Sequence, residues 1–395
     1  MSGVKTILVV GAGIAGLAAA LAFARRGCAV KVFERVSSFA SIGAGIQLSP
    51  NATRILRELG VLDHLAPLAV EPDAVVLRRA ASLTEIGRVP LGEGAFTRWG
   101  APYLTAHRAD LHTALLKAVE ATTAIQLNLG ISVDNFELDP PRLVTGTLEH
   151  SGDLIIAADG VWSTIRAEAG KTGESRFIGQ LAWRRTIDRD SDAGRAFTAA
   201  CPGKVVTAIL HPGFHLVAYP LRAGAEINLV AFTHYRKEIG EGWAQTPDIA
   251  TLRNAMRGAA PVLTKLTEDG VWTAWPIHVA DLDGAWIEPR GLALVGDAAH
   301  AMTPFAAQGA AMAIEDVWML AGAVCGAAGL LDDALNGWAI GRRRRVLRVA
   351  RRGAFNEFAW HAREPMATAR DMMVRRRGPE RLAADMDWLY GWKAG

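Results

Sequence analysis

The most constraining feature of this sequence is a glycine-rich turn between two short apolar segments near its N-terminus. Residues 5–10 (KTILVV) form an apolar run of strand length, and Gly11-Ala12-Gly13-Ile14-Ala15-Gly16 follows directly. Residues 17–24 are strong helix formers, and residues 29–33 (AVKVF) form a second strand-like run that ends at Glu34. The order strand, glycine turn, helix, strand, acid predicts a Rossmann-like βαβ unit that binds a dinucleotide.

Each residue type in this turn has a physical task. Gly11 permits the tight turn, Gly13 lets the backbone approach a pyrophosphate, and Gly16 lets the helix pack close to the strand. The helix N-terminus presents free N–H groups and a positive dipole end to the phosphates. Glu34 is placed to accept hydrogen bonds from a ribose diol. This pattern alone does not choose between NAD and FAD.

Charge and composition argue against a polyanion-binding protein. The 395 residues include 43 basic and 40 acidic side chains, which gives a net charge of +3 and no global attraction to nucleic acid or membrane. The arginine clusters at 342–345, 351–352 and 375–377 lie in a part of the chain that reads as helical, so we expect solvated helix faces. We therefore predict neither nucleic-acid nor membrane binding.

The cysteines and the uncharged segments indicate a soluble cytoplasmic protein. Cys28, Cys201 and Cys325 are odd in number, far apart in the sequence and without a C-x-x-C pair. A disulfide framework or a zinc site is therefore not expected, and no metal site is predicted. The uncharged stretches 6–24 and 317–331 are interpreted as buried interior segments and not as membrane anchors.

Two later segments favour FAD. Residues 154–166 form an apolar strand that ends at Asp159-Gly160, and residues 291–316 contain a strand that ends at Gly296-Asp297. Asp297 at a strand end can bind a ribityl hydroxyl. The turn after it leads to a helix that starts near Gln308-Gly309-Ala310, whose first N–H groups could face the flavin pyrimidine edge.

These two segments resemble the DG and GD motifs of the group A FAD-dependent aromatic hydroxylases, the para-hydroxybenzoate hydroxylase family. The resemblance extends over nearly the whole chain and is strongest to the salicylate, 3-hydroxybenzoate and 6-hydroxynicotinate monooxygenases. Besides the two motifs, it rests on residues 43–51, 88–92, 103–111 and 387–391.

The resemblance implies roles for several residues near FAD. Arg108 is implied to lie against the phosphate–ribityl region, although on charge alone it could be a surface arginine that caps the 110–120 helix. Asp159 is implied to serve FAD and the passing nicotinamide cofactor, although it could be a simple helix cap with Ser163 as its partner. The remaining expected FAD contacts are Ala15, Arg35, Gln47 and Ile131.

The implied reaction is ring hydroxylation. In this family NADH or NADPH reduces FAD, and O2 then forms a C4a-hydroperoxide that attacks an electron-rich phenolic or hydroxypyridine-type ring, in some cases with decarboxylation. The protein must orient the ring, exclude water and help ionise its hydroxyl.

Residues 214–221 supply the catalytic candidates. They alternate as a strand does, which places His215, Val217 and Tyr219 on one face. Both polar positions match substrate-contacting residues of the phenol- and pyridinol-hydroxylating relatives. His215 is the candidate base or phenolate partner, and Tyr219 the orienting hydroxyl. The competing interpretation is a core histidine and a packing tyrosine. His300 is expected to brace the flavin loop.

Two positions depart from the family pattern. Gln47 stands where the hydroxynicotinate branch has a histidine, and Ala301 stands where relatives usually carry proline. Two other functions remain open on the sequence: a flavin oxidase or dehydrogenase, and a non-catalytic FAD-binding protein.

The expected architecture is α/β, with a Rossmann-like FAD-binding domain interleaved with a β-sheet substrate domain and followed by C-terminal helices. The FAD-binding domain is predicted at 1–70, 106–176 and 285–340, the substrate domain at 71–105 and 177–284, and the helical segment at 341–395. A monomer or homodimer is expected.

Overall fold

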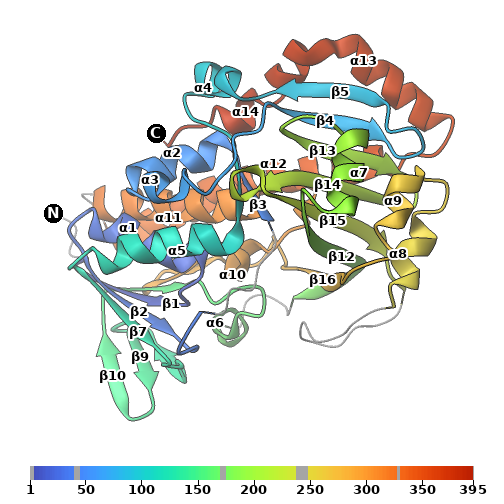
Figure 1. Cartoon of the computed structure of the whole chain (residues 1–395). Helices are drawn as coiled ribbons and strands as arrows, with labels where there is room; N and C mark the ends of the chain where they lie inside the picture. The colour runs from blue at the N-terminus through green and yellow to red at the C-terminus, as the bar shows by residue number, and fades with distance from the viewer. Residues whose placement is uncertain (1–3, 40–44, 170–174, 237–247, 327–329, 395) are drawn as a thin grey trace.

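The computed structural model describes residues 4–39, 45–169, 175–236, 248–326 and 330–394. Within them the chain forms a mixed α/β fold with two large sheets and a run of C-terminal helices (Figure 1), which is the predicted fold class. Gly43 and Ala44, the first two residues of the family-like segment 43–51, lie outside the described residues.

The first sheet contains the predicted βαβ unit. Its central strand β1 pairs in parallel with β2 on one side and with β11 on the other, so that Val9 lies opposite both Val32 and Ile156. Its central strands are continuous apolar runs, as expected for a parallel sheet covered on both faces. The order is β17 (Ile287–Glu288), β18 (Leu292–Leu294), β11 (Leu154–Ala157), β1 (Thr6–Val10), β2 (Ala29–Glu34) and β7 (Ile125–Leu129), with only β17 antiparallel.

Helices cover one face of this sheet and a small antiparallel ribbon lies on the other side (Figure 1). The ribbon contacts the sheet through His150, whose ring centroid lies 4.7 Å from that of Phe33. The helices are α1 (Ile14–Ala24), α5 (Arg108–Glu120) and α11 (Gly309–Gly326), and the ribbon strands are β8 (Asn135–Glu137), β9 (Arg142–Thr145) and β10 (Leu148–Ser151).

The second sheet has seven strands and is antiparallel except for one parallel pair, β13 with β4. Phe214, Leu216 and Ala218 of β14 pack into a separate outer core, whereas His215, Val217 and Tyr219 share the other face of the strand, as predicted. The order is β16 (Thr273–Val279), β12 (Arg176–Asp188), β15 (Glu226–His234), β14 (Phe214–Leu221), β13 (Val205–His211), β4 (Ala74–Arg79) and β5 (Glu85–Pro90).

Short elements join the two sheets. Strands β3 (Gly45–Leu48) and β6 (Leu104–His107) form a two-stranded ladder between them, and α12 (Leu331–Trp360) runs behind both (Figure 1). The other connecting elements are α2 (Pro50–Glu58), α3 (Leu62–Leu65), α4 (Glu93–Trp99), α6 (Thr164–Glu168), the 3-10 turn η1 (Arg222–Gly224), α10 (Asp297–His300), the 3-10 turn η2 (Pro304–Ala306), α13 (Met366–Ala384) and α14 (Asp387–Tyr390).

Two details differ from the expectation. Residues 177–280 contain three helices as well as strands: α7 (Asp192–Ala200), α8 (Ala250–Ala255) and α9 (Pro261–Lys265) cover the outer core of the second sheet. Their glycine and proline neighbours suggested only turns. The C-terminal helices begin at Leu331 and not at 341, because Asp332 and Asp333 sit in a favourable first turn.

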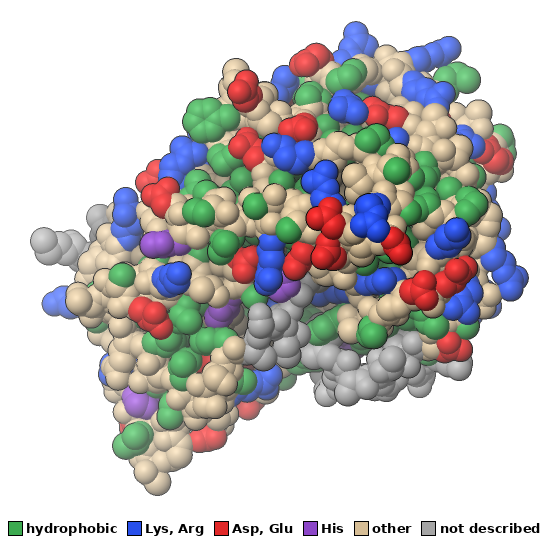
Figure 2. All heavy atoms as spheres, in the orientation of Figure 1, with side chains coloured by type: hydrophobic (Ala, Val, Ile, Leu, Met, Phe, Trp, Pro, Cys, Tyr) green, Lys and Arg blue, Asp and Glu red, His purple; other side chains and the backbone are tan. Residues whose placement is uncertain are grey.

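Helix α11 is the one described helix that is long and apolar enough to cross a membrane, yet 56% of it is buried inside the protein. That burial is typical of a core helix. On the face shown in Figure 2, basic and acidic side chains are interspersed, with no broad field of one sign.

Two glycines of the N-terminal turn provide a matched test of the packing. A Cβ on Gly16 would lie 1.8 Å from the carbonyl oxygen of Gly11, whereas a Cβ on Gly13 would meet nothing within 4 Å. We expect Gly16→Ala to lower the free energy of unfolding by about 1–3 kcal/mol through overpacking. Gly13→Ala should change it by less than about 0.5 kcal/mol. Urea denaturation measures both, and equal losses would contradict this packing.

Candidate active site

Three backbone corners meet at the carboxyl edge of the first sheet. They follow the neighbouring parallel strands β1, β11 and β18, whose ends lie together. A Cβ on Gly11 would lie 2.5 Å from the carbonyl oxygen of Ala158, and one on Gly296 would lie 3.1 Å from the Cβ of Ala15. The corners therefore touch, and side chains are excluded where they do.

Glu34 anchors the first corner. Its Oε2 accepts a hydrogen bond from the Ala12 N–H at 2.8 Å, and its Oε1 accepts one from the Val36 N–H at 3.0 Å. The Ile131 N–H donates to the Glu34 carbonyl at 2.9 Å, so Ile131 lies beside this acid, and Arg35 is exposed next to it. The structure thus brings these predicted residues to one place.

Asp159 forms the second corner, and the two oxygens of its carboxylate differ in their hydrogen bonding. Its Oδ2 accepts from the Ile165 N–H at 3.4 Å, while its buried Oδ1 has no partner among the described residues. Burial raises the pKa of Asp159. The cap of α6 is Ser163, whose hydroxyl accepts from the Arg166 N–H at 3.0 Å. Asp159 also hydrogen-bonds the Ser163 side chain, as the helix-cap interpretation expected, and its contact with FAD stays a prediction.

Arg166 joins the second and third corners, a role that the sequence analysis missed. Its guanidinium is buried and donates to the Ala298 carbonyl at 2.9 Å and to the Val161 carbonyl at 2.6 Å. Asp297 starts α10 with an exposed side chain. Arg166 belongs to the family-like segment 154–166, so its presence was visible, but its target was not.

Arg108 lies exposed at the first position of α5. The cap of that helix is His107, whose Nδ1 accepts from the Ala109 N–H at 3.2 Å. Arg108 therefore does not cap the helix, because His107 does, but it is a surface arginine as the alternative interpretation expected, and its contact with FAD stays a prediction.

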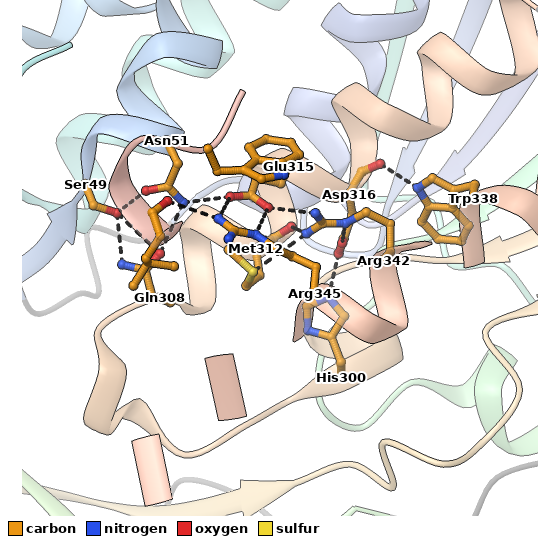
Figure 3. Close-up of polar contacts among 12 residues, drawn as sticks. Ser49, Asn51, His300, Gln308, Met312, Glu315, Asp316, Trp338, Arg342 and Arg345 are labelled. Atoms are coloured by element: carbon orange, nitrogen blue, oxygen red, sulfur yellow. Dashed lines mark hydrogen bonds and ion pairs between the residues drawn. The ribbon is translucent and has the colours of Figure 1, made fainter. Parts of the chain in front are cut away.

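The N-terminus of α11 is held by a buried polar network (Figure 3). The Gln308 side chain donates to the Ser49 hydroxyl at 2.9 Å and accepts from Asn51 at 3.2 Å. The Gln308 side chain is thus turned toward residues 49–51, and α11 begins at Gly309, which is exposed. A Cβ on Gly309 would meet nothing within 4 Å.

The same network runs through three buried charges and the partly buried Arg345 (Figure 3). Arg342 donates to Glu315 at 2.6 Å and to Asp316 at 2.8 Å, and Arg345 donates to Glu315 at 2.9 Å. His300 Nε2 lies 2.5 Å from Asp316 Oδ2, which agrees with its expected bracing role. Burial alone would raise the pKa of Asp316, but His300 and Arg342 hold it below its ordinary value.

Tyr219 lies under the ladder that joins the two sheets. A Cβ on Gly45 would lie 2.5 Å from the Tyr219 ring, and the Gly45 N–H donates to Asn228 Oδ1 at 2.8 Å. Gln47 accepts from the Tyr103 hydroxyl at 2.8 Å and also hydrogen-bonds Tyr219. Burial raises the pKa of Tyr219, so its hydroxyl stays protonated and can donate.

The terminal family-like segment 387–391 braces this cluster. Asp387 accepts from the Trp99 indole N–H at 2.8 Å, and the Tyr390 ring packs edge-on against Tyr103 with centroids 5.7 Å apart. The C-terminus therefore reaches the same region as Gln47.

Arg184 is a candidate residue that the sequence analysis missed. It lies in register with Val230 and Val217, one row from Tyr219 and one row from His215 on the same face of the sheet. Its guanidinium stacks 5.3 Å from the Trp275 ring centroid, and burial lowers its pKa. Among the described residues no hydrogen bond or ion pair satisfies this guanidinium, and its Nε is buried without a partner. The strand pattern gave no signal that this arginine points inward.

His215 lies fully buried in a nest of rings from Phe232, Phe305 and Trp360. Its Nδ1 lies 3.0 Å from Nε2 of His361, and its own Nε2 has no partner in the described part of the chain. Burial lowers the pKa of His215 well below its ordinary value, with a further contribution from His361. His215 is therefore neutral near pH 7. In the same described residues no group of histidine, cysteine or acidic side chains is placed to hold a metal ion.

Comparison with known proteins links this site to flavin chemistry. Residues 4–339 match the model of a family described as FAD binding domain. The chain is 33% identical to a 3-hydroxybenzoate 6-hydroxylase of Polaromonas naphthalenivorans, over 98% of this chain and 96% of that protein. It is 32% identical to a 6-hydroxynicotinate 3-monooxygenase of Bordetella bronchiseptica, over 81% and 82% of the two chains. It superposes on a salicylate hydroxylase–substrate complex with a TM-score of 0.82 and 25% identity, over 99% and 96% of the two chains.

The pair His215–His361 predicts acid sensitivity. Burial, together with His234 and His211, lowers the pKa of His361 to about 4. Between pH 6.5 and 4 the unfolded chain therefore binds a proton that the folded protein does not, so stability falls as pH falls through this window. We expect a loss of about 2.4 kcal/mol from this residue between pH 7 and pH 4.5, which His361→Gln should abolish.

Urea denaturation at pH 7 and at pH 4.5 measures the difference. His64→Gln, at an exposed histidine of α3, is the control and should keep the wild-type loss. The same loss in wild type and His361→Gln would refute this assignment.

Proposed function

The chain belongs to the FAD-dependent aromatic monooxygenases of the FAD-binding-domain family, and we propose that its substrate is a small hydroxylated aromatic carboxylate. The ring is of the phenol or hydroxypyridine type, and NADH or NADPH is the reductant. The relatives named above favour oxygen insertion over a flavin oxidase, a dehydrogenase or a non-catalytic carrier. The observation that carries the substrate class is the unpaired, inward-facing Arg184.

The residues at the sheet edge fit FAD. The space in front of Gly13 is open, so the N–H groups of α1 can bind a pyrophosphate, with Glu34 at the adjacent ribose. The exposed Asp297 suits a ribityl hydroxyl, and Asp159, whose buried Oδ1 has no hydrogen-bond partner among the described residues, lies at the neighbouring corner. The further proposed contacts are Gly11, Ala15, Gly16, Arg35, Gln47, Arg108, Ile131, Gly309 and Ala310. FAD supplies the activation of O2 and the transfer of one oxygen atom.

Gln308 is proposed as a positioning residue and not as a flavin ligand through its side chain. Its amide is occupied by Ser49 and Asn51. It therefore fixes the start of α11, and the backbone N–H groups of that start can stabilise negative charge.

A carboxylate substrate would satisfy the charge of Arg184. Arg184 is partly buried and has no acid beside it among the described residues, and a bidentate carboxylate is the best partner of a guanidinium. The salicylate, hydroxybenzoate and hydroxynicotinate in the relatives' names are all aromatic carboxylates with a ring hydroxyl. Tyr219, one row away, can donate its hydroxyl to the ring oxygen and orient it.

His215 is proposed as the base that removes the ring hydroxyl proton. If Nδ1–H donates to His361, the unpartnered Nε2 of His215 is left as an acceptor. Its neutral state near pH 7 keeps this lone pair available. The aromatic rings around it exclude water.

We further propose that the first sheet with its helices binds FAD and that the second sheet forms the substrate side, with the domain bounds 1–70, 106–176 and 285–340 against 71–105 and 177–284. A cytoplasmic monomer or homodimer is part of the same proposal.

The substrate class is tested by paired aromatic compounds. Holoenzyme should oxidise NADH or NADPH faster with salicylate, 3-hydroxybenzoate or 6-hydroxynicotinate than with the same rings lacking the carboxylate, and mass spectrometry should show a product with one added oxygen. Arg184→Gln should raise KM for the carboxylate about 10–100-fold and leave KM for the uncharged ring nearly unchanged.

Bound flavin is measured in the same samples, so that a lost FAD contact is distinguished from a lost substrate contact. Peroxide release without an oxygenated product would contradict the monooxygenase proposal. An equal change of KM for both compounds of a pair would remove Arg184 from substrate recognition.

The role of His215 is tested with His215→Gln, which keeps a polar group in the ring nest. We expect full flavin content but a loss of at least about 100-fold in kcat for hydroxylation, because the ring hydroxyl is no longer ionised by a base. A substrate added as its phenolate at high pH should recover part of the rate. Unchanged product formation at pH 7 would mean that His215 is a packing residue.

A further inference from the structure

Two thiols that are distant in the sequence meet at the end of the first sheet opposite the candidate site. Cys28 immediately precedes β2, and Cys325 is the penultimate residue of α11. They are 297 residues apart, yet their sulfur atoms lie 3.5 Å from each other. Both are free cysteines, and a disulfide needs a separation of about 2.05 Å. Closing the bond therefore requires a shift of only about 1.5 Å.

The surroundings of the pair make the two sulfurs unequal. Cys28 is 3% exposed, whereas Cys325 is only half-buried and can be reached from solvent. The hydrogen bond from Cys28 and the charge of Arg26 lower the pKa of Cys325. Arg26 is itself held in place, because it donates to the Ala22 carbonyl at 2.9 Å and stacks 4.4 Å from the Trp318 ring centroid. Cys325 thus has the character of an attacking thiolate, and Cys28 that of a resolving thiol.

We propose that Cys28 and Cys325 are a peroxide-reactive pair that closes reversibly to an intramolecular disulfide. The Cys325 thiolate attacks hydrogen peroxide, the O–O bond breaks, and a sulfenic acid forms with release of hydroxide. The sulfur of Cys28 then attacks the sulfenic sulfur, and its proton leaves with the hydroxyl as water. In sum two thiols lose two electrons and two protons, and one peroxide becomes two waters.

Disulfide formation by Cys28 and Cys325 does not depend on the proposed substrate or on the proposed base, because the two thiols lie far from the candidate active site. Helix α11 has 18 residues, so Cys325 lies roughly 25 Å from the helix start at Gly309. A disulfide would fasten the far end of α11 to the strand that ends at Glu34. It is expected to stabilise the first sheet without altering the recognition of an aromatic compound.

The third cysteine provides an internal control. Cys201 lies in the outer core of the second sheet, where burial raises its pKa. Holoenzyme is treated with hydrogen peroxide and denatured in iodoacetamide without reductant. Intact mass should show one alkylated cysteine in place of the three in the sequence. Dithiothreitol should restore three.

The serine variants distinguish the pair from general oxidation. The Cys201→Ser variant should still form the Cys28–Cys325 disulfide, whereas Cys28→Ser and Cys325→Ser should not. In Cys28→Ser, dimedone should trap the sulfenic acid on Cys325. The oxidised wild type should melt about 3–6 °C above the reduced protein, with no such shift in Cys28→Ser. The proposal would be overturned if the wild type still had three alkylated thiols after peroxide treatment. It would also be overturned if peroxide raised the melting temperature of Cys28→Ser as much as that of the wild type.

Discussion

The buried ion network on α11 is the interaction on which the rest of the structure depends. Glu315 and Asp316 are adjacent on this helix and have no exposed surface, and Arg342 and Arg345 of α12 balance their charges. Removing one partner from such a buried pair lowers the free energy of unfolding by about 3–5 kcal/mol, because the remaining buried charge is neither paired nor solvated. The network also includes Asn51, so one set of contacts fixes the C-terminal helices, the α11 start and the β3–α2 junction together.

This arrangement gives the site two walls with different physical properties. The first sheet contributes backbone corners, where close contacts such as that of Gly11 with Ala158 leave no room for side chains. The second sheet contributes a face of side chains in strand register, with Arg184 between the rows of His215 and Tyr219. In the proposed function, an elongated dinucleotide occupies the first wall, and a small ring with an anionic group occupies the second. This difference between the two walls follows from the two kinds of sheet: the turns after the parallel strands present backbone, and one face of the largely antiparallel sheet presents side chains.

Local patterns allowed the first wall to be predicted from the sequence. Strand, glycine turn and acid are contiguous at residues 6–34, and Asp159 and Asp297 each follow an apolar strand, so neighbouring residues were enough. The second wall was predicted only in part. The alternation of β14 placed His215 and Tyr219 on one face, but the inward direction of Arg184 depends on its pairing with β15. The contact of His215 with His361 spans 146 residues, and no periodicity reports on such a contact.

The strand order of the first sheet has a consequence for how the protein is made. Strand β11 occupies the position beside β1, and β18 lies beyond it, although their residues follow those of β1 by some 150 and 285 positions. During synthesis on the ribosome the opening βαβ unit therefore emerges with one edge of β1 uncovered, and its native neighbour appears only after the ribbon has been translated. Long-range parallel pairing of this kind is slow and leaves an edge open to other chains. The edge of β1 therefore stays unpaired until residues 154–157 have been made, and the edge of β11 stays unpaired until residues 292–294 follow.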